Sequence, residues 1–235
     1  MSGWVKKKTW VNTSVELVGS SFAVLLDDEY LHTPKKAKVL LPTQRLAEKL
    51  ADEWQTQSEN IDPSTMPYSR LVNSAIDKVQ ANFDSIVLDL LAYGDTDLVC
   101  YRAESPRDLV LLQQKNWDPI LLWAKKNLDV DLKITTGITY KPQNLTERQK
   151  LFKLINSYDF FSLTGFYDLV TISGSLLVAL AVINNHISPL VGLDLSFLEE
   201  DWQRKKWGQD EESINNKSNK LEEFQIAFNF LSLLA

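Results

Sequence analysis

The sequence predicts an α+β protein, with a small N-terminal domain of antiparallel β-sheet plus a helix and a larger, all-α C-terminal domain. Apolar residues alternate with other residues over much of 9–41, which is typical of strands. Pro63 and Pro67 then end whatever structure precedes them. After Pro67 the apolar residues recur at steps of three and four, which indicates helix. We therefore expect an N-terminal mixed α/β domain at 1–65 and a helical domain at 66–235.

Composition and charge exclude several classes of protein. The 235 residues are 44% hydrophobic, enough for a sizeable core, and the net charge of -6 argues against a general nucleic-acid binder. Cys100 is the only cysteine, which excludes an intramolecular disulfide and a thiolate-rich metal site. The longest apolar run, Leu169 to Ile183, is shorter than the roughly 20 residues of a membrane span. It is interpreted as buried helix, and the N-terminus shows no secretory signal.

The N-terminal domain is expected to hold two to four antiparallel strands. Val11 to Leu17 alternates, Gly19 and Ser20 offer a turn, and Phe22 to Leu26 resumes the alternation. A second turn follows at Asp27 to Glu29, and Ala37 to Leu41 is the last short strand candidate. The pattern predicts a meander.

A single amphipathic helix is expected to cover one face of this sheet. Thr43 is its predicted N-cap, and Leu46, Leu50 and Trp54 lie four residues apart on one side. Trp54 is interpreted as a buried core anchor near the domain join, where Pro67 opens the next helix.

The rest of the chain is predicted to be mainly helical. Ser105-Pro106 and Ser188-Pro189 each combine a capping serine with a proline typical of a first helical turn. Trp117-Asp118-Pro119 indicates the start of a separate helix with Trp117 buried, and Asp95 to Glu104 reads as extended. The segment Leu132 to Ile138 is ambiguous, with a short strand as one reading. The expected helices cover 67–94, a stretch after 106, another after 117, 146–158, 160–174, 175–185, 188–208 and the residues from about 210 onward.

One cluster offers catalytic chemistry. Asp95 and Asp97 would point the same way on an extended segment, with Arg102 nearby, and this is the best candidate site for a hydrolase or a small-molecule-binding enzyme. In the structural interpretation, which we favour, Asp95 caps or turns the chain after Gly94 and Asp97 pairs with Arg102.

A second cluster combines charges with aromatic residues in LSFLEEDWQRKKWGQDEE, Leu195 to Glu212. On a helix, acidic residues could pair with Arg204 and Lys205 one turn later, which gives a solvated, self-paired face. Trp202 and Trp207 among these charges instead favour a protein-binding surface. The residues alone leave both readings open.

Five segments together resemble the assembly chaperones of the ATP synthase catalytic head, the F1-ATPase, that hold its free alpha subunit. Their order and spacing fit the family over nearly the whole chain. The segments are LADEWQTQ (50–57), MPYSRLVNSAID (66–77), DTDLVCYRAE (95–104), LLQQKNWDPILLWA (111–124) and LEEDWQRKKWG (198–208).

The resemblance implies a mixed α/β domain followed by a helical domain, no enzyme activity, no cofactor and no metal. It implies that the partner is the F1 alpha subunit, held by a monomer without membrane insertion, in the bacterial cytoplasm or, after removal of a presequence, in the mitochondrial matrix. The acidic run Asp210 to Glu212 departs from the family pattern. The residues expected to bind the client are Glu199, Glu200, Asp201, Trp202 and Trp207.

Overall fold

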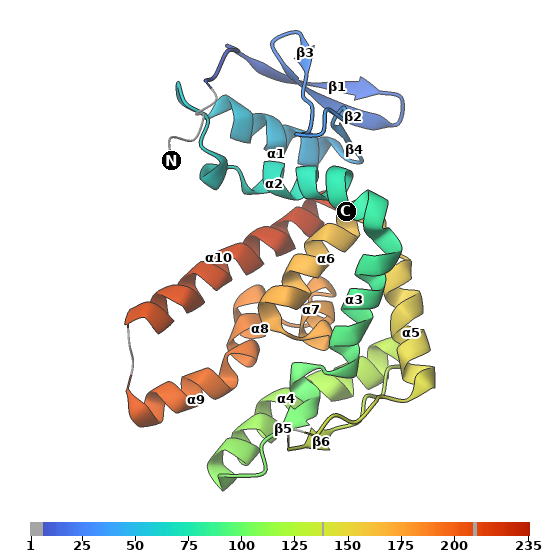
Figure 1. The fold of residues 1–235 in the computed structure, drawn as a ribbon, viewed down its shortest axis with the longest axis vertical. Helices are drawn as coiled ribbons and strands as arrows, with labels where there is room; N and C mark the ends of the chain where they lie inside the picture. Colours follow the sequence, from blue (N-terminus) through green and yellow to red (C-terminus); the bar gives the residue numbers. More distant parts are fainter. Residues whose placement is uncertain (1–6, 138, 209–210) are drawn as a thin grey trace. The chain divides into compact units, whose positions relative to one another are not determined.

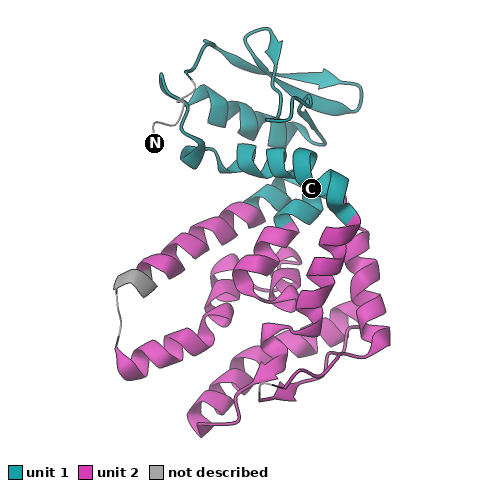
Figure 2. Cartoon of the chain, viewed as in Figure 1, with its two compact units in different colours: residues 1–83, 160–165, 229–235 teal, residues 84–159, 166–228 magenta. Residues whose placement is uncertain are grey.

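The computed structural model describes residues 7–137, 139–208 and 211–235, without the side chains of 211–214. The acidic run Asp210 to Glu212 therefore lies outside the described side chains. The α+β class is confirmed: strands and one helix come first and helices dominate thereafter (Figure 1). The chain forms two compact units: unit 1 contains 1–83, 160–165 and 229–235, and unit 2 contains 84–159 and 166–228 (Figure 2). The expected domain boundary after residue 65 stays a prediction.

Unit 1 contains a four-stranded antiparallel sheet built around its second strand. β1 (Thr13–Val18) and β2 (Ser21–Leu26) form a hairpin, and Gly19 adopts the positive φ that this two-residue turn requires. β3 (Glu29–Tyr30) and β4 (Leu40–Leu41) both pair with the other edge of β2. The sheet is therefore antiparallel as expected but not a simple meander, because its last strand returns to β2.

Helix α1 (Gln44–Gln55) packs against β1 and β2 and contributes buried residues to the core of unit 1. The Thr43 hydroxyl accepts a hydrogen bond from the Leu46 N–H, which confirms the predicted cap. Leu46 and Leu50 of α1 are fully buried, as are Ala23 and Val24 of β2. The apolar periodicity read from the sequence is thus the buried face of this helix.

A helical path leads out of the sheet region. The 3-10 turn Pro63–Thr65 precedes α2 (Pro67–Ser74), a π-helical stretch (Ala75–Val79), a second 3-10 turn (Gln80–Asn82) and α3 (Phe83–Asp95). The helix predicted from Pro67 is therefore present, but its backbone hydrogen bonding changes three times along its length, from α to π to 3-10 and back to α.

Unit 2 is helical, apart from a short parallel strand pair. β5 (Tyr101–Arg102) pairs with β6 (Thr135–Thr136). Of the extended segment expected at 95–104, only β5 is strand, because Asp95 ends α3 and Leu98–Cys100 form a 3-10 turn. At the centre lies α7 (Leu176–Ile183), whose residues from Leu176 to Val182 are all buried. Further helices include α5 (Leu145–Asn156), α6 (Phe160–Ser173) and α10 (Glu211–Leu234), of which α6 and α10 contribute residues to both units.

Two helix predictions were wrong. Helix α4 (Arg107–Leu128) runs unbroken through Pro119, so no helix starts at Trp117. A proline inside a helix costs about 3 kcal/mol, and α4 offsets this by burying Trp117, Ile120 and Trp123 along one face. Conversely, the single helix expected over 188–208 is divided at Phe197 into α8 (Pro189–Ser196) and α9 (Leu198–Trp207).

Candidate functional site

All five residues expected to bind a client lie on α9 in unit 2. Glu199, Glu200 and Asp201 occupy its first turn, whereas Arg204, Lys205 and Lys206 occupy its last turn. This order matches the helix macrodipole, which favours negative charge at the N-terminus and positive charge at the C-terminus. Part of the charge pattern therefore stabilises the helix itself.

Glu199 faces inward. Its Oε1 atom accepts a hydrogen bond from Gln113 Nε2 of α4. Gln113 is fully buried and its Oε1 atom accepts from the Ala103 N–H at 2.9 Å. Burial raises the pKa of the Glu199 carboxyl, and the Gln113 hydrogen bond opposes this shift. Glu199 thus belongs to a chain of contacts that joins α9 to α4 and to the residue after β5.

Asp201 is held by cations of the same unit. It pairs with Arg204 one turn along α9 and with Lys217 Nζ of α10 at 2.9 Å. Lys217 also contacts Asp194 of α8 at 2.6 Å, so its ammonium group links three helices. Burial alone would raise the pKa of Asp201, but hydrogen bonds from Lys217 and Arg204 outweigh it and lower that pKa. Both Asp201 carboxylate oxygens therefore already pair with cations of the same chain.

Glu200 and the two tryptophans present a different surface. Glu200 is exposed, and the Trp207 side chain is 75% exposed. Trp202 is half-buried: its Nε1 donates to Asp108 Oδ2 at 3.2 Å, and its ring lies edge-to-face with Trp207 at 6.0 Å between centroids. Lys206 Nζ lies 4.2 Å from the Trp202 ring. An exposed tryptophan supported by a second, anchored one is typical of a protein-binding surface.

A groove of about 530 Å³ lies beside this surface, between α8, α9 and α10. Its apolar wall includes Leu190, which is 54% exposed, and Leu221. Lys217 and Asp201 form part of its polar wall. The sequence interpretation missed Leu190, Lys217 and Leu221, because Lys217 is 16 positions from Asp201 and no local pattern connects the two.

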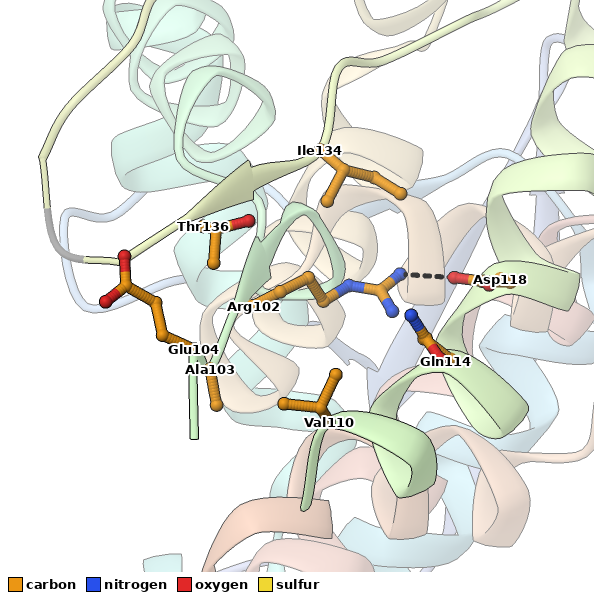
Figure 3. A pocket seen from close by; sticks show the side chains of 8 residues that line it. All are labelled: Arg102, Ala103, Glu104, Val110, Gln114, Asp118, Ile134 and Thr136. Carbon is orange, nitrogen blue, oxygen red and sulfur yellow. Dashed lines mark ion pairs between the residues drawn. The ribbon is translucent and has the colours of Figure 1, made fainter. Parts of the chain in front are cut away.

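The three candidate catalytic residues have different partners in the structure. Asp95 ends α3 and pairs with Arg148 at 2.8 Å, and Asp97 is fully buried and accepts hydrogen bonds at the start of α7. Arg102 pairs instead with Asp118 of α4 at 2.9 Å (Figure 3). The expected pair between Asp97 and Arg102 is therefore wrong, and each of the three side chains has a structural partner of its own.

The three expected structural anchors differ in burial. Trp117 is fully buried and its Nε1 donates to the Leu195 carbonyl at 2.9 Å. Trp54 was expected to be buried but is only half-buried, because it lies near the end of α1. Its Nε1 donates a hydrogen bond to Ser69 Oγ at 3.0 Å. Pro67 is the first residue of α2.

Comparisons with known proteins give a consistent result. The sequence model of the family described as ATP12 chaperone protein matches residues 7–125. The crystal structure of Atp12 from Paracoccus denitrificans is 39% identical, covers 97% of this chain and 98% of its own, and has a TM-score of 0.94. An aspartate-to-lysine mutant of that protein gives the same values. The Atu1473 protein from Agrobacterium tumefaciens is 32% identical over 98% of this chain and 87% of its own, with a TM-score of 0.93.

Proposed function

This chain belongs to the ATP12 chaperone family, and from this membership we propose that its client is the free alpha subunit of the F1-ATPase. The chain is thus a chaperone of ATP synthase assembly. The matched family and the five sequence segments in register support the alpha subunit as the protein held. We propose that the complex forms before the alpha subunit pairs with beta.

The chemistry of assembly explains what such a protein needs. A subunit that will be buried in a complex exposes apolar surface while it is free, and such patches favour aggregation. A chaperone must cover this surface and later release it, which requires a separable interface rather than covalent chemistry. The separate structural partners of Asp95, Asp97 and Arg102 fit this role better than the enzyme alternative.

We propose that the α9 surface, defined as Glu199, Glu200, Asp201, Trp202 and Trp207, is the part that meets the client. The observation that supports it best is the 75% exposure of Trp207 next to the anchored Trp202. Within this surface, Glu200 and Trp207 are available to a partner, whereas Glu199 and Asp201 are engaged by Gln113 and Lys217. The latter two carboxylates therefore position the helix.

The test compares variants that leave the contacts of Glu199 with Gln113 and of Asp201 with Lys217 intact. Glu200→Lys and Trp207→Ala are each co-expressed with the alpha subunit, and the soluble fraction of that subunit is measured. We expect both to reduce it strongly, because a charge reversal or the loss of a central aromatic at an interface costs about 2 kcal/mol or more. Glu222→Lys on α10, where the side chain is also exposed, is the matched control.

Melting curves of the purified variants separate folding from binding. Exposed single charges change stability by about 0 to 1 kcal/mol, so Glu200→Lys should melt like the parent protein. Asp201→Lys is unsuitable because it would place two lysines together at Lys217. Full rescue of the alpha subunit by normally folded Glu200→Lys and Trp207→Ala proteins would move the docking surface elsewhere.

We further propose that the protein acts as a monomer in the bacterial cytoplasm, or in the mitochondrial matrix if a presequence has been removed. The solved relatives come from Paracoccus denitrificans and Agrobacterium tumefaciens, which supports the bacterial location. Among the helices of the described residues, none has the length and apolar character needed to span a bilayer. Size-exclusion chromatography with light scattering tests the monomer directly, and a mass of two chains would contradict it.

A further inference from the structure

The sheet of unit 1 has an open edge at β1. β2 lies between β1 on one side and β3 and β4 on the other, so β1 has a neighbouring strand on one side only among the described residues. Its six residues pair with β2 in continuous register, without a bulge. The strand contains neither lysine nor proline, which commonly protect an edge strand from further pairing. The fold therefore leaves this edge able to accept another strand.

The hydrogen bonds of the hairpin identify the backbone groups that face outward. The Asp27 N–H donates to the Asn12 carbonyl at 2.8 Å, so these two residues form a hydrogen-bonded pair. Hydrogen-bonded and non-hydrogen-bonded pairs alternate along an antiparallel ladder. The outward N–H and C=O groups of β1 therefore belong to Thr13, Val15 and Leu17. Within the described ranges, no group outside the β1–β2 ladder forms a hydrogen bond with them.

This row of groups selects an extended strand as its occupant. The outward donors and acceptors repeat every second residue, about 6.6 Å apart, which is also their spacing along another strand. A helix uses its N–H and C=O groups internally and offers no such row. The edge is accessible, because Ser14 and Glu16 are exposed and the Leu17 side chain is 63% exposed. Addition of a strand to an open sheet edge is a common mode of peptide recognition.

The charges around the hairpin select a cationic strand. Between Thr9 and Pro34 the sequence contains no lysine or arginine but four carboxylates, which are Glu16, Asp27, Asp28 and Glu29. Glu16 Oε2 accepts a hydrogen bond from the Tyr30 hydroxyl at 2.9 Å, which leaves the carboxylate charged. Lys38 lies over the Tyr30 ring of β3, on the far side of β2 from this edge. An acidic strand would be repelled here, whereas a cationic one would be attracted.

We propose that the β1 edge, defined as the outward backbone groups of Thr13, Val15 and Leu17, binds an extended, cationic segment of a protein partner. The N–H and C=O groups of the partner continue the ladder. Thr13 Oγ1 donates to the Ala51 carbonyl of α1 at 3.1 Å, so the side chains of Thr13, Val15 and Leu17 share the face toward α1 and Glu16 lies on the other face. The matching partner strand alternates cationic residues on the Glu16 face with apolar residues beside Leu17.

The experiment titrates the isotope-labelled full chain with the blocked peptide acetyl-KVKVKV-amide and measures amide hydrogen exchange by NMR. We expect exchange at Thr13, Val15 and Leu17 to slow by about threefold or more at saturation, because a hydrogen-bonded amide exchanges only when the bond opens. The intervening amides of β1 already bond to β2 and should change less. Acetyl-EVEVEV-amide should have little effect because of its charge, and acetyl-KPKVKP-amide because proline lacks an N–H.

Three results would overturn the proposal. The first is the absence of protection by acetyl-KVKVKV-amide. The second is equal protection by the acidic or the proline-containing peptide, since the edge would then select neither a cationic nor an extended segment. The third is equal slowing at all residues of β1, which would indicate a general change of the hairpin and not strand addition.

A pair of lysine substitutions separates the edge from a general effect of charge. Leu17→Lys removes an apolar contact and adds a like charge beside the cationic strand, so it should weaken peptide binding about threefold. Val11→Lys is the matched control, because Val11 is 73% exposed and its N–H and carbonyl already bond to Asp27 and Gln55. Equal affinity of the two variants would contradict the proposal. None of these measurements involves the alpha subunit or α9, so they stand apart from the test of the proposed function.

Discussion

The first turns of α2 in unit 1 and α7 in unit 2 are both capped by a buried carboxylate from another part of the chain. Glu53 of α1 accepts from the N–H groups of Tyr68 and Ser69 at 2.7 and 2.8 Å. Asp97 accepts from the Leu177 N–H at 2.9 Å and from Ser175 Oγ at 2.6 Å. Helix N-termini leave unsatisfied N–H groups and favour negative charge, so both carboxylates meet the same requirement.

The two helices differ in whether their own N-cap residue also supplies a side-chain hydrogen bond. At α7, Ser175 is itself the N-cap and accepts from the Val178 N–H at 3.0 Å, so Asp97 adds to a cap already present. At α2, Met66 offers no side-chain hydrogen bond, and Glu53 is the side chain that caps the helix. Asp97 is fully buried whereas Glu53 is 8% exposed. The burial of a capping carboxylate is therefore a separate property from the presence of an N-cap side chain in the helix itself.

The tryptophans of the two units give the sharpest contrast and the largest expected effect. Trp117→Ala should lower the free energy of unfolding by about 4 to 5 kcal/mol, because a fully buried side chain leaves a cavity and the Leu195 carbonyl loses its donor. Trp54→Ala removes the same atoms from a half-buried position and should cost only about 2 kcal/mol. Urea unfolding of both variants measures the difference, and a loss at Trp54 as large as that at Trp117 would contradict it.

Asp97→Ala should have the next largest effect, a loss of about 3 to 4 kcal/mol at neutral pH. It leaves the Leu177 N–H, the Val99 N–H and the Ser175 hydroxyl without their acceptor, and each buried unsatisfied group costs about 1 to 3 kcal/mol. Removal of a desolvated charge offsets part of this loss. Asp97→Asn keeps one acceptor oxygen and should lose less; a loss below about 1 kcal/mol in Asp97→Ala would show that Ser175 caps α7 unaided.

The pH dependence tests the burial of Asp97. Burial raises its pKa from 3.8 to about 6, against hydrogen bonds from Ser175, Leu177 and Val99 that lower it. Since the folded pKa is the higher one, the folded chain holds the proton more tightly than the unfolded chain does. The stabilisation from protonated Asp97 is therefore fully present below about pH 4 and is lost as the pH rises through about 6.

The shift corresponds to at most about 3 kcal/mol, at 1.36 kcal/mol per pKa unit. Asp97→Asn removes this titration. The free energy of unfolding of the parent chain minus that of Asp97→Asn should therefore fall between pH 4.5 and pH 7.5. Urea titrations at the two pH values measure it, and a constant difference would mean that Asp97 is ionised throughout this range.

Caps adjacent in sequence were predicted in part. Ser105 was expected to cap the helix after it, but this was wrong: Pro106 is the N-cap of α4, which starts at Arg107 and has no side-chain cap hydrogen bond. Ser188 was read from the cap-and-proline pattern, and its hydroxyl accepts from the Val191 N–H at 3.3 Å, as predicted. The roles of Glu53 at α2 and Asp97 at α7 could not be predicted, because the groups that they accept from in these helices lie 15 or more and 78 or more residues away. Pro119 misled the helix prediction for the same reason: the burial that offsets the proline comes from the whole of unit 2, not from its neighbours in sequence.

At the candidate site, too, features set by neighbouring residues could be predicted and contacts between distant residues could not. The sequence placed charges and aromatic residues together on one helix, which was sufficient to single out α9. It could not distinguish Glu200, which is exposed, from Asp201, which pairs with Lys217 of another helix. Local pattern thus predicts which residues share an element, and tertiary contacts decide which of them remain available to a partner.

Glu53→Ala is expected to have a smaller effect than Asp97→Ala, a loss of about 2 kcal/mol. Burial raises the pKa of Glu53, and the hydrogen bonds from Tyr68 and Ser69 lower it, so this carboxylate is stabilised by contacts of the same kind as Asp97. Its removal deprives two N–H groups and the Ser69 hydroxyl of their acceptor. The cost should nevertheless be lower than at Asp97, because water can enter the vacated, partly exposed position and bond these donors.

Two controls make this prediction decisive. Glu48→Ala changes an exposed glutamate of the same helix and should cost less than about 0.5 kcal/mol. Glu53→Gln keeps an acceptor oxygen and should recover part of the loss. If Glu53→Ala destabilises the protein as much as Asp97→Ala in parallel urea titrations, then the missing local cap at Met66, and not the depth of burial, sets the cost of losing a carboxylate from the start of a helix.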